Sequence, residues 1–176
     1  MLFRSTGAEL AARRDRLFAL APPQRHHRIL DLNARTGLLT WEALRRVPEG
    51  GVYALVTDPQ ALAALEHQVT SLPEIHRPIL LLGSLADPPA AIAGLTFDRL
   101  VGYNVLGSLP EPLTFAPNLR SWLGEGGVAL LTETIPRQSQ RISELVTATA
   151  LSPPLRESWQ AAEARFLADQ IGRAHV

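Results

Sequence analysis

The segment from Asp31 to Gly37 is the part of the chain best suited to hold a cofactor. It overlaps the end of a mainly apolar run, Arg28 to Leu32, and precedes a helical stretch. Binding turns at this place in an α/β protein use glycine, because a residue without a side chain permits positive φ and close backbone approach. This turn reads N-A-R-T-G and holds one glycine. A nicotinamide cofactor needs G-x-G-x-x-G, so the spacing does not support that cofactor.

Four further polar residues each follow a later apolar run, and they are Asp58, Ser84, Asp87 and Asn104. The first three of them have an ordinary structural use. Asp58 before Pro59 is a frequent helix cap, and S-L-A-D-P-P is typical turn chemistry.

Several chemistries are excluded by residue types that the chain lacks. It contains no cysteine, and all 17 residues counted as Lys or Arg are arginine. Cysteine nucleophiles, thiolate metal sites, P-loop lysines and Schiff-base lysines are therefore excluded. No serine lies in a G-x-S-x-G elbow. We predict no metal site, because metal-ligand spacing is absent from the five histidines, His26, His27, His67, His76 and His175. No residue type or spacing identifies a catalytic residue.

The charge pattern gives little support for a nucleic acid or a membrane as partner. Basic and acidic residues number 17 each, so the formal net charge is zero. The stretch from Arg13 to Arg28 is locally basic and could contact phosphate. No aromatic pattern there suggests base stacking, so a solvated helix face is favoured. No apolar run reaches roughly eighteen residues. We expect a cytoplasmic protein without direct DNA contact by this domain.

Five short apolar runs are predicted strands, and helical stretches separate them. Thr6 and Glu9 have capping-box spacing, which predicts a helix from Thr6 to about Leu20. The predicted strands are Arg28–Leu32, Val52–Thr57, Ile79–Leu82, Asp98–Tyr103 and Gly127–Glu133. The predicted helices between them are Leu38–Val47, the stretch opened by Asp58-Pro59, a short one at Pro89–Ala93, and Leu113–Leu123. Beyond Pro136 the pattern is helical, in SQRISELVTATAL and ESWQAAEARFLADQIG.

These elements predict an α/β fold. Strands that are apolar at nearly every position, alternating with amphipathic helices, indicate a mainly parallel sheet covered on both faces. Right-handed crossovers then produce a doubly wound sheet. We expect an N-terminal helix and linker over residues 1–24, a Rossmann-like core over 25–136, and a helical extension of the same domain over 137–176.

Four segments in one order resemble the class I S-adenosylmethionine-dependent methyltransferases. The first strand, turn and helix of that family are similar to HRILDLNARTGLLTWEAL, and the second strand and helix to GGVYALVTDPQALAAL. The fourth strand resembles FDRLVGYNVLGSLPEP, and the fifth strand with its preceding helix resembles NLRSWLGEGGVALLTETIP. The resemblance runs roughly from Arg28 to Pro136 and implies strand order 3-2-1-4-5. The antiparallel strand pair that ends family members has no counterpart, because no strand-like run follows Glu133.

The resemblance also implies an S-adenosylmethionine site, whose turn departs from the family pattern. Asp31 stands at the start of the cofactor turn, and Asn33, Arg35 and Gly37 occupy its three glycine positions. Asn33 is a tolerable substitute, because asparagine visits the left-handed region more readily than most residues. Arg35 either turns away from the site, or projects into the space of the methionyl part, or pairs with its carboxylate.

Four more residues are carried over by the resemblance. Asp58 is the nearest acid to the ribose position, although aligning D-P-Q-A-L with the family's usual S-P-E-A-L places Val56 there and leaves Asp58 as a helix cap. Ser84 or Asp87 approaches the adenine amino group. Asn104 faces the reacting centre.

A more specific resemblance concerns a larger protein. Three segments, TGLLTWEALRRVPEGGVYALV, PRQSQRISELV and AAEARFLAD, resemble a methyltransferase-like domain attached to a bacterial replication-associated recombination ATPase of the AAA+ class. This resemblance implies a non-catalytic accessory module, partnered by a covalently attached or associated ATPase module. An active S-adenosylmethionine-dependent methyltransferase of unknown acceptor is the alternative, and the turn from Asn33 to Gly37 discriminates between the two.

Overall fold

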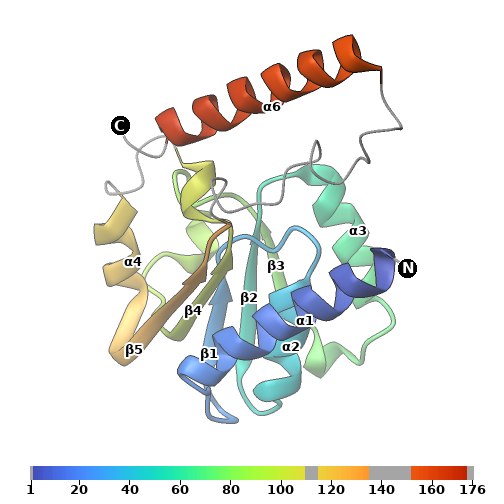
Figure 1. Ribbon diagram of the computed structural model, residues 1–176. Coiled ribbons are helices and arrows are strands. Elements are labelled where there is room, and N and C mark those ends of the chain that lie inside the picture. The colour runs from blue at the N-terminus through green and yellow to red at the C-terminus, as the bar shows by residue number, and fades with distance from the viewer. Residues whose placement is uncertain (1, 110–114, 135–151, 174–176) are drawn as a thin grey trace. The chain divides into compact units, whose positions relative to one another are not determined.

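The computed structural model describes residues 2–109, 115–134 and 152–173 of the chain. It divides into two compact units, Met1–Thr132 and Glu133–Val176. The first unit contains a sheet with helices on both of its faces (Figure 1). The second unit contributes one described helix, α6, at Pro153–Arg173.

The sheet has five strands in the order β3-β2-β1-β4-β5, and every adjacent pair is parallel. This confirms the predicted doubly wound α/β sheet. The strands are β1 (Arg28–Asp31), β2 (Gly51–Val56), β3 (Ile79–Leu82), β4 (Phe97–Tyr103) and β5 (Leu123–Thr132). Among the described residues no strand follows β5.

Helices of the first unit cover both faces of this sheet. The α-helices are α1 (Leu2–Leu20), α2 (Leu38–Arg46), α3 (Pro59–Val69) and α4 (Ala116–Trp122). Three short 3-10 turns, η1 (Glu74–His76), η2 (Ala90–Ile92) and η3 (Leu106–Ser108), lie in the connections. None of the helices in the described ranges is long and apolar enough to cross a membrane.

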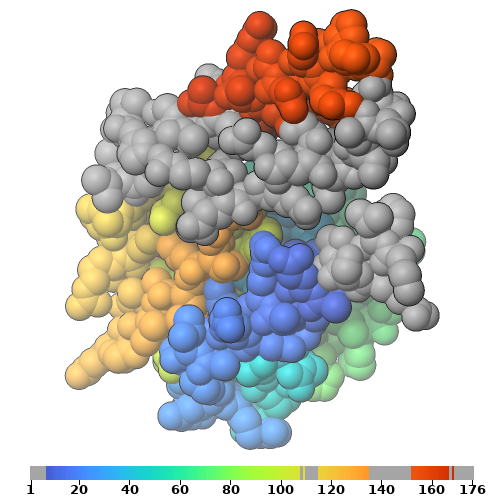
Figure 2. Space-filling model, viewed as in Figure 1, coloured from blue at the N-terminus to red at the C-terminus, as the bar shows by residue number. Residues whose placement is uncertain are grey.

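Alternating strand residues point to opposite faces, and each face has its own core. Ile29 of β1 packs with Leu17 and Phe18 of α1 and with Leu39 of α2. A smaller cluster joins β2 to Leu65 of α3 on that side. A third cluster packs on the opposite face of the sheet. It contains the strand residues Leu30, Leu55 and Leu100 together with Ile92, Phe97 and Trp122. Figure 2 shows α1 on one side of the molecule, between β5 and α2.

A charged cluster holds α2 beside α1. Glu42 is buried, and its carboxylate accepts hydrogen bonds from the guanidinium groups of Arg45 and Arg46. These hydrogen bonds, Arg45 first, lower the pKa of Glu42 to about 2. The guanidinium of Arg46 also lies over the ring of Phe18 in α1, 4.8 Å from its centroid, a cation–π contact between the two helices.

Two predicted boundaries are wrong for local reasons. The helix α1 begins at Leu2, so Thr6 is inside it and does not cap it; Glu9 pairs with Arg13 one turn later instead. The strand β5 begins at Leu123 rather than Gly127, because Leu123 pairs with Phe97 before a register shift in the ladder. Residues 113 and 114 of the predicted helix Leu113–Leu123, and the predicted helix SQRISELVTATAL, lie outside the described residues.

Candidate functional site

The candidate site lies at the carboxyl ends of β1, β2 and β4, which we call the carboxyl edge. Strand β1 has β2 on one side and β4 on the other. The strand order therefore reverses at β1, and open α/β sheets bind ligands outside the carboxyl ends of their strands at such a point. The turn from Asp31 to Gly37 leaves β1 at this place.

Asp31 ends β1 and is 1% exposed. Its Oδ2 accepts a hydrogen bond from the Thr40 hydroxyl at 2.7 Å, and its Oδ1 accepts one from the Asn33 backbone N–H at 3.2 Å. Burial raises the pKa of Asp31 to about 6, against the lowering effect of the Thr40 and Asn33 hydrogen bonds. Both carboxylate oxygens are engaged inside the protein, so Asp31 fastens β1 and its turn to α2.

The Asn33 side chain joins β1 to β4 across the carboxyl edge. Its Nδ2 donates to the carbonyl oxygen of Tyr103 at 2.9 Å and to that of Asn104 at 3.3 Å. These carbonyls belong to the last residue of β4 and to the residue that follows it. An amide therefore stands at a position where the family pattern has glycine, which carries no side chain.

Arg35 is exposed. Its backbone N–H donates to the Asn33 carbonyl at 2.9 Å, and the preceding residue, Ala34, donates to the Leu55 carbonyl of β2. Within the part of the chain that the structure describes, the Arg35 guanidinium has no hydrogen-bond or ion-pair partner.

Gly37 is the one glycine of the turn, and the structure gives it a packing role. It precedes α2 with φ of 75° and ψ of 5°, the left-handed conformation. The Trp41 indole lies against it, so a Cβ at this position would meet Nε1 of Trp41 and stand 2.7 Å from Cε2. The backbone conformation and the indole both require glycine here, independently of any ligand.

Asp58 caps a helix. Its carboxylate accepts hydrogen bonds from the backbone N–H groups of Gln60 and Ala61 at the start of α3, at 3.1 and 3.3 Å. Val56, at the end of β2, is 1% exposed and apolar. Of the two alternatives left open by the sequence, the structure therefore has the cap, and the residue aligned with the ribose position has no hydrogen-bonding side chain.

The cap leads to a first prediction. Asp58→Ala leaves two N–H groups of α3 without their acceptor, and we expect the free energy of unfolding to fall by about 1 kcal/mol. Asp58→Asn keeps an acceptor oxygen and is expected to lose less than half of that. Urea denaturation followed by circular dichroism measures both. An equal loss in the two variants would contradict the capping role.

Ser84 and Asp87 form two hydrogen bonds with each other in the turn after β3. The Ser84 hydroxyl accepts from the Asp87 backbone N–H, and the Asp87 carbonyl accepts from the Ser84 backbone N–H, both at 3.1 Å. Leu85 between them is 2% exposed and packs into the core. The local turn accounts for this segment without a ligand.

Asn104 follows β4 with φ of 52°, and it is the one described non-glycine residue in the left-handed region. Its backbone N–H donates to the Thr132 carbonyl of β5 at 2.8 Å. The neighbouring Tyr103 hydroxyl accepts a hydrogen bond from Arg13 of α1 at 3.3 Å. The end of β4 is therefore joined to β5, to α1 and, through Asn33, to β1.

The structure brings Asp31, Asn33 and Asn104 together, and it keeps Asp58, Ser84 and Asp87 in their own local turns. Sequence reasoning missed Thr40, the hydroxyl that binds Asp31. Its signal was a polar residue on the buried side of α2, three residues after Gly37.

No group of described residues could hold a metal ion. His27 is buried, its Nδ1 accepts from the Gln24 backbone N–H at 3.1 Å, and burial lowers its pKa.

Comparisons with known proteins agree with this fold. A malonyl-[acyl-carrier protein] O-methyltransferase of Halalkalibacterium halodurans is 31% identical over 108 residues, which make up 59% of this chain and 38% of that protein. The chain thus spans well under two thirds of this relative. No protein-family model matches the chain.

Solved methyltransferases have similar structures at low sequence identity. Coclaurine N-methyltransferase, bound to N-methylheliamine and S-adenosylhomocysteine, matches 69% of this chain and 35% of its own with a TM-score of 0.62 and 16% identity. The match to the glycopeptide N-methyltransferase MtfA with S-adenosylmethionine covers 71% of this chain and 56% of that protein, with a TM-score of 0.56 and 23% identity. The match to mycolic acid cyclopropane synthase covers 78% of this chain and 50% of that protein, with a TM-score of 0.60 and 17% identity. The chain therefore has the Rossmann-like fold of class I S-adenosylmethionine-dependent methyltransferases.

Proposed function

We propose that this chain is a non-catalytic methyltransferase-like accessory module of a larger AAA+ ATPase involved in DNA replication or recombination. The observation that carries the non-catalytic part is the Asn33 side chain, whose amide donates to Tyr103 and Asn104 across the carboxyl edge. A ligand lying over β1 and β4 would have to displace this amide from both of its hydrogen bonds, which costs free energy.

The remaining polar groups support the same proposal. Asp31 is engaged by Thr40, Asp58 by the first turn of α3, and Ser84 by Asp87. Val56 offers no carboxylate to a ribose. A cofactor is held by a few convergent polar groups, and here those groups hold the protein's own backbone.

The ATPase part of the proposal rests on the sequence resemblance of three segments. The chain has no lysine, so ATP hydrolysis would belong to another part of the protein or to its partner. Reading the genomic locus tests the fused form. A continuous reading frame with a G-x-x-x-x-G-K-[ST] motif ahead of this domain supports it, and a stop codon and an unrelated preceding gene contradict it.

Calorimetric titration with S-adenosylmethionine and S-adenosylhomocysteine tests the non-catalytic part. We expect no binding heat from the native chain or from Asp58→Ala, which serves as the control that changes an acid outside the turn. Cofactor binding by Asn33→Gly but not by Arg35→Gly would indicate that the Asn33 amide is the group that prevents cofactor binding in the native chain. Micromolar binding by the native chain would overturn the proposal.

Two observations favour the alternative, an active methyltransferase of unknown acceptor. They are the 31% identity to the malonyl-[acyl-carrier protein] O-methyltransferase and the similarity to structures with S-adenosylmethionine or S-adenosylhomocysteine. In this alternative the cofactor supplies the methyl group, this chain contributes mainly by positioning, and Asn104 orients the acceptor. Native binding in the same titration would lead to a search for that acceptor.

A further inference from the structure

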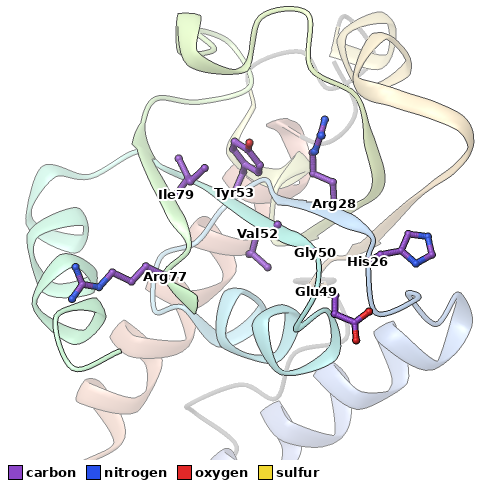
Figure 3. A pocket seen from close by; sticks show the side chains of 9 residues that line it. His26, Arg28, Glu49, Gly50, Val52, Tyr53, Arg77 and Ile79 are labelled. Atoms are coloured by element: carbon purple, nitrogen blue, oxygen red, sulfur yellow. The ribbon is translucent and has the colours of Figure 1, made fainter. Parts of the chain in front are cut away.

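A pocket of about 410 Å³ lies at the amino ends of β1, β2 and β3, at the opposite end of these strands from the carboxyl edge (Figure 3). Its lining includes Arg28, Tyr53, Arg77 and Ile79. A volume of several hundred Å³ suits a small organic ligand. No residue of the turn from Asp31 to Gly37 lines it, so the pocket is separate from the candidate site described above.

The strand register builds the floor of this pocket. Arg28 of β1 pairs with Gly51 of β2, and Tyr53 of β2 pairs with Ile79 of β3. Paired residues of parallel strands share a face, and so do residues two apart. Figure 3 accordingly shows Arg28, Tyr53 and Ile79 projecting from the same side of the sheet. A Cβ at Gly51 would be 3.6 Å from the Tyr53 ring and 3.9 Å from Cγ of Arg28, so Gly51 leaves the space between them open.

The short connection from β3 to β4 explains why this floor is not filled. Its one helical element is η2, three residues long, whereas a doubly wound sheet normally covers such a face with a longer helix. Ile92 of η2 is buried in the core, but Ile79 is 46% exposed. The exposed side of Ile79 and the partly buried Tyr53 therefore both line the open pocket.

Neither of the pocket's two guanidinium groups, those of Arg28 and Arg77, forms an ion pair with a described carboxylate. The Arg28 guanidinium donates to the Thr96 carbonyl at 3.2 Å, and that of Arg77 donates to the Leu72 carbonyl at 3.0 Å. Carbonyl oxygens orient these groups without removing their charge. The one lining carboxylate, Glu49, is paired with Arg25 at 2.8 Å.

One other acid lies nearby, and it binds the backbone. Asp98 accepts a hydrogen bond from the Arg28 backbone N–H at 2.7 Å. The guanidinium of Arg28 therefore keeps donors for an external partner beside the Tyr53 ring. Arg77, at the rim, adds a second positive charge.

We propose that this pocket binds a small organic oxyanion, a carboxylate or a phosphate monoester, carried on a flat apolar body. Arg28 would donate to the oxyanion, since guanidinium groups bind both kinds of anion with charge-assisted hydrogen bonds. Tyr53 and Ile79 would contact the apolar body on the floor that Gly51 leaves open. The proposal is independent of the function proposed for the carboxyl edge, because the two sites share no residue.

Nuclear magnetic resonance titration of the isotope-labelled full chain tests this site with three probes: benzoate, phenyl phosphate and neutral benzyl alcohol. We expect saturable shifts of the Gly51, Tyr53 and Ile79 amides with at least one anion, and the tighter of the two anions identifies the preferred group. Benzyl alcohol is expected to bind at least tenfold more weakly than that anion, since it lacks the charged partner of Arg28.

Three variants sharpen the test. Arg28→Gln is expected to weaken the anion roughly tenfold, because it removes a charge-assisted hydrogen bond. Gly51→Val, a β-favourable change that fills the floor, is expected to abolish binding without altering charge. Arg120→Gln, at an exposed arginine of α4 that does not line the pocket, is the matched control and is expected to change nothing.

Three results would overturn the proposal: no saturation with either anion, equal binding of benzyl alcohol, or equal weakening by Arg28→Gln and Arg120→Gln. Arg28→Gln retains the backbone hydrogen bond to Asp98, so it decides the question if Gly51→Val fails to fold.

Discussion

Asp31→Asn is expected to increase the stability of the protein at neutral pH and to remove a pH dependence that the native protein has. The ordinary pKa of an aspartate is 3.8, and burial raises that of Asp31 to about 6 in the folded chain. As pH rises between these values, the unfolded chain releases the proton while the folded chain keeps it. Stability is therefore lost as pH rises, and the loss is complete above the folded pKa.

The two pKa values set the size of this effect. Their difference, 6 minus 3.8, is about 2.2 units, which corresponds to about 3 kcal/mol at roughly 1.4 kcal/mol per unit. Asparagine has no proton to release, so it keeps a neutral group beside Thr40 at every pH. We expect the stability of Asp31→Asn minus that of the native chain to increase by about 3 kcal/mol between about pH 3 and pH 7.

Urea denaturation at a series of pH values measures this difference directly. Any constant offset from the altered hydrogen bond to Thr40 appears equally at all pH values and does not affect the slope. Thr40→Val is the companion variant. It removes a hydrogen bond that lowers the pKa of Asp31, so it is expected to enlarge the pH dependence of the native chain. A pH-independent difference between Asp31→Asn and the native chain would contradict the raised pKa.

Gly37→Ala is expected to destabilise the first unit by about 2 to 5 kcal/mol. The left-handed backbone at Gly37, with φ of 75°, accounts for about 1 to 2 kcal/mol in a residue that carries a Cβ. The contact of that Cβ with the Trp41 indole adds overpacking of a further 1 to 3 kcal/mol. The indole is half-buried against the α3 side of the core, so it has little room to move away.

A double-mutant cycle with Trp41→Leu separates the two contributions. If the indole is part of the penalty, Gly37→Ala is expected to be at least about 1 kcal/mol less destabilising in the Trp41→Leu background. The destabilisation by Gly37→Ala that remains in the Trp41→Leu background measures the cost of the left-handed backbone at this position. Identical effects of Gly37→Ala in both backgrounds would show that Trp41 does not press on this position. The stabilities come from the same denaturation measurements.

These two residues change how the turn is interpreted. In the sequence, Asp31 and Gly37 are the parts of the turn that agree with the methyltransferase pattern. In the structure, the Asp31 carboxylate is closed in by Thr40 and Asn33, and the space beside Gly37 is taken by Trp41. Both residues therefore have a structural reason to be present whether or not a cofactor binds.

The sequence by itself determined the sheet. Strands such as β2 and β4 are apolar at most positions because both of their faces are buried, and this pattern is local and readable. Asp58 before Pro59 was readable as a cap for the same reason, since a capping side chain binds N–H groups only two and three residues away.

Only the tertiary structure decided what the polar residues do. The partners of Asn33 are about seventy residues away in the chain, at Tyr103 and Asn104, and β1 and β4 must pair before the amide reaches them. The pocket between Arg28 and Ile79 likewise exists because β1, β2 and β3 align in register. Hydrogen bonds and pocket surfaces formed by strands that are distant in the sequence depend on strand register and side-chain direction. A single sequence does not specify either of them.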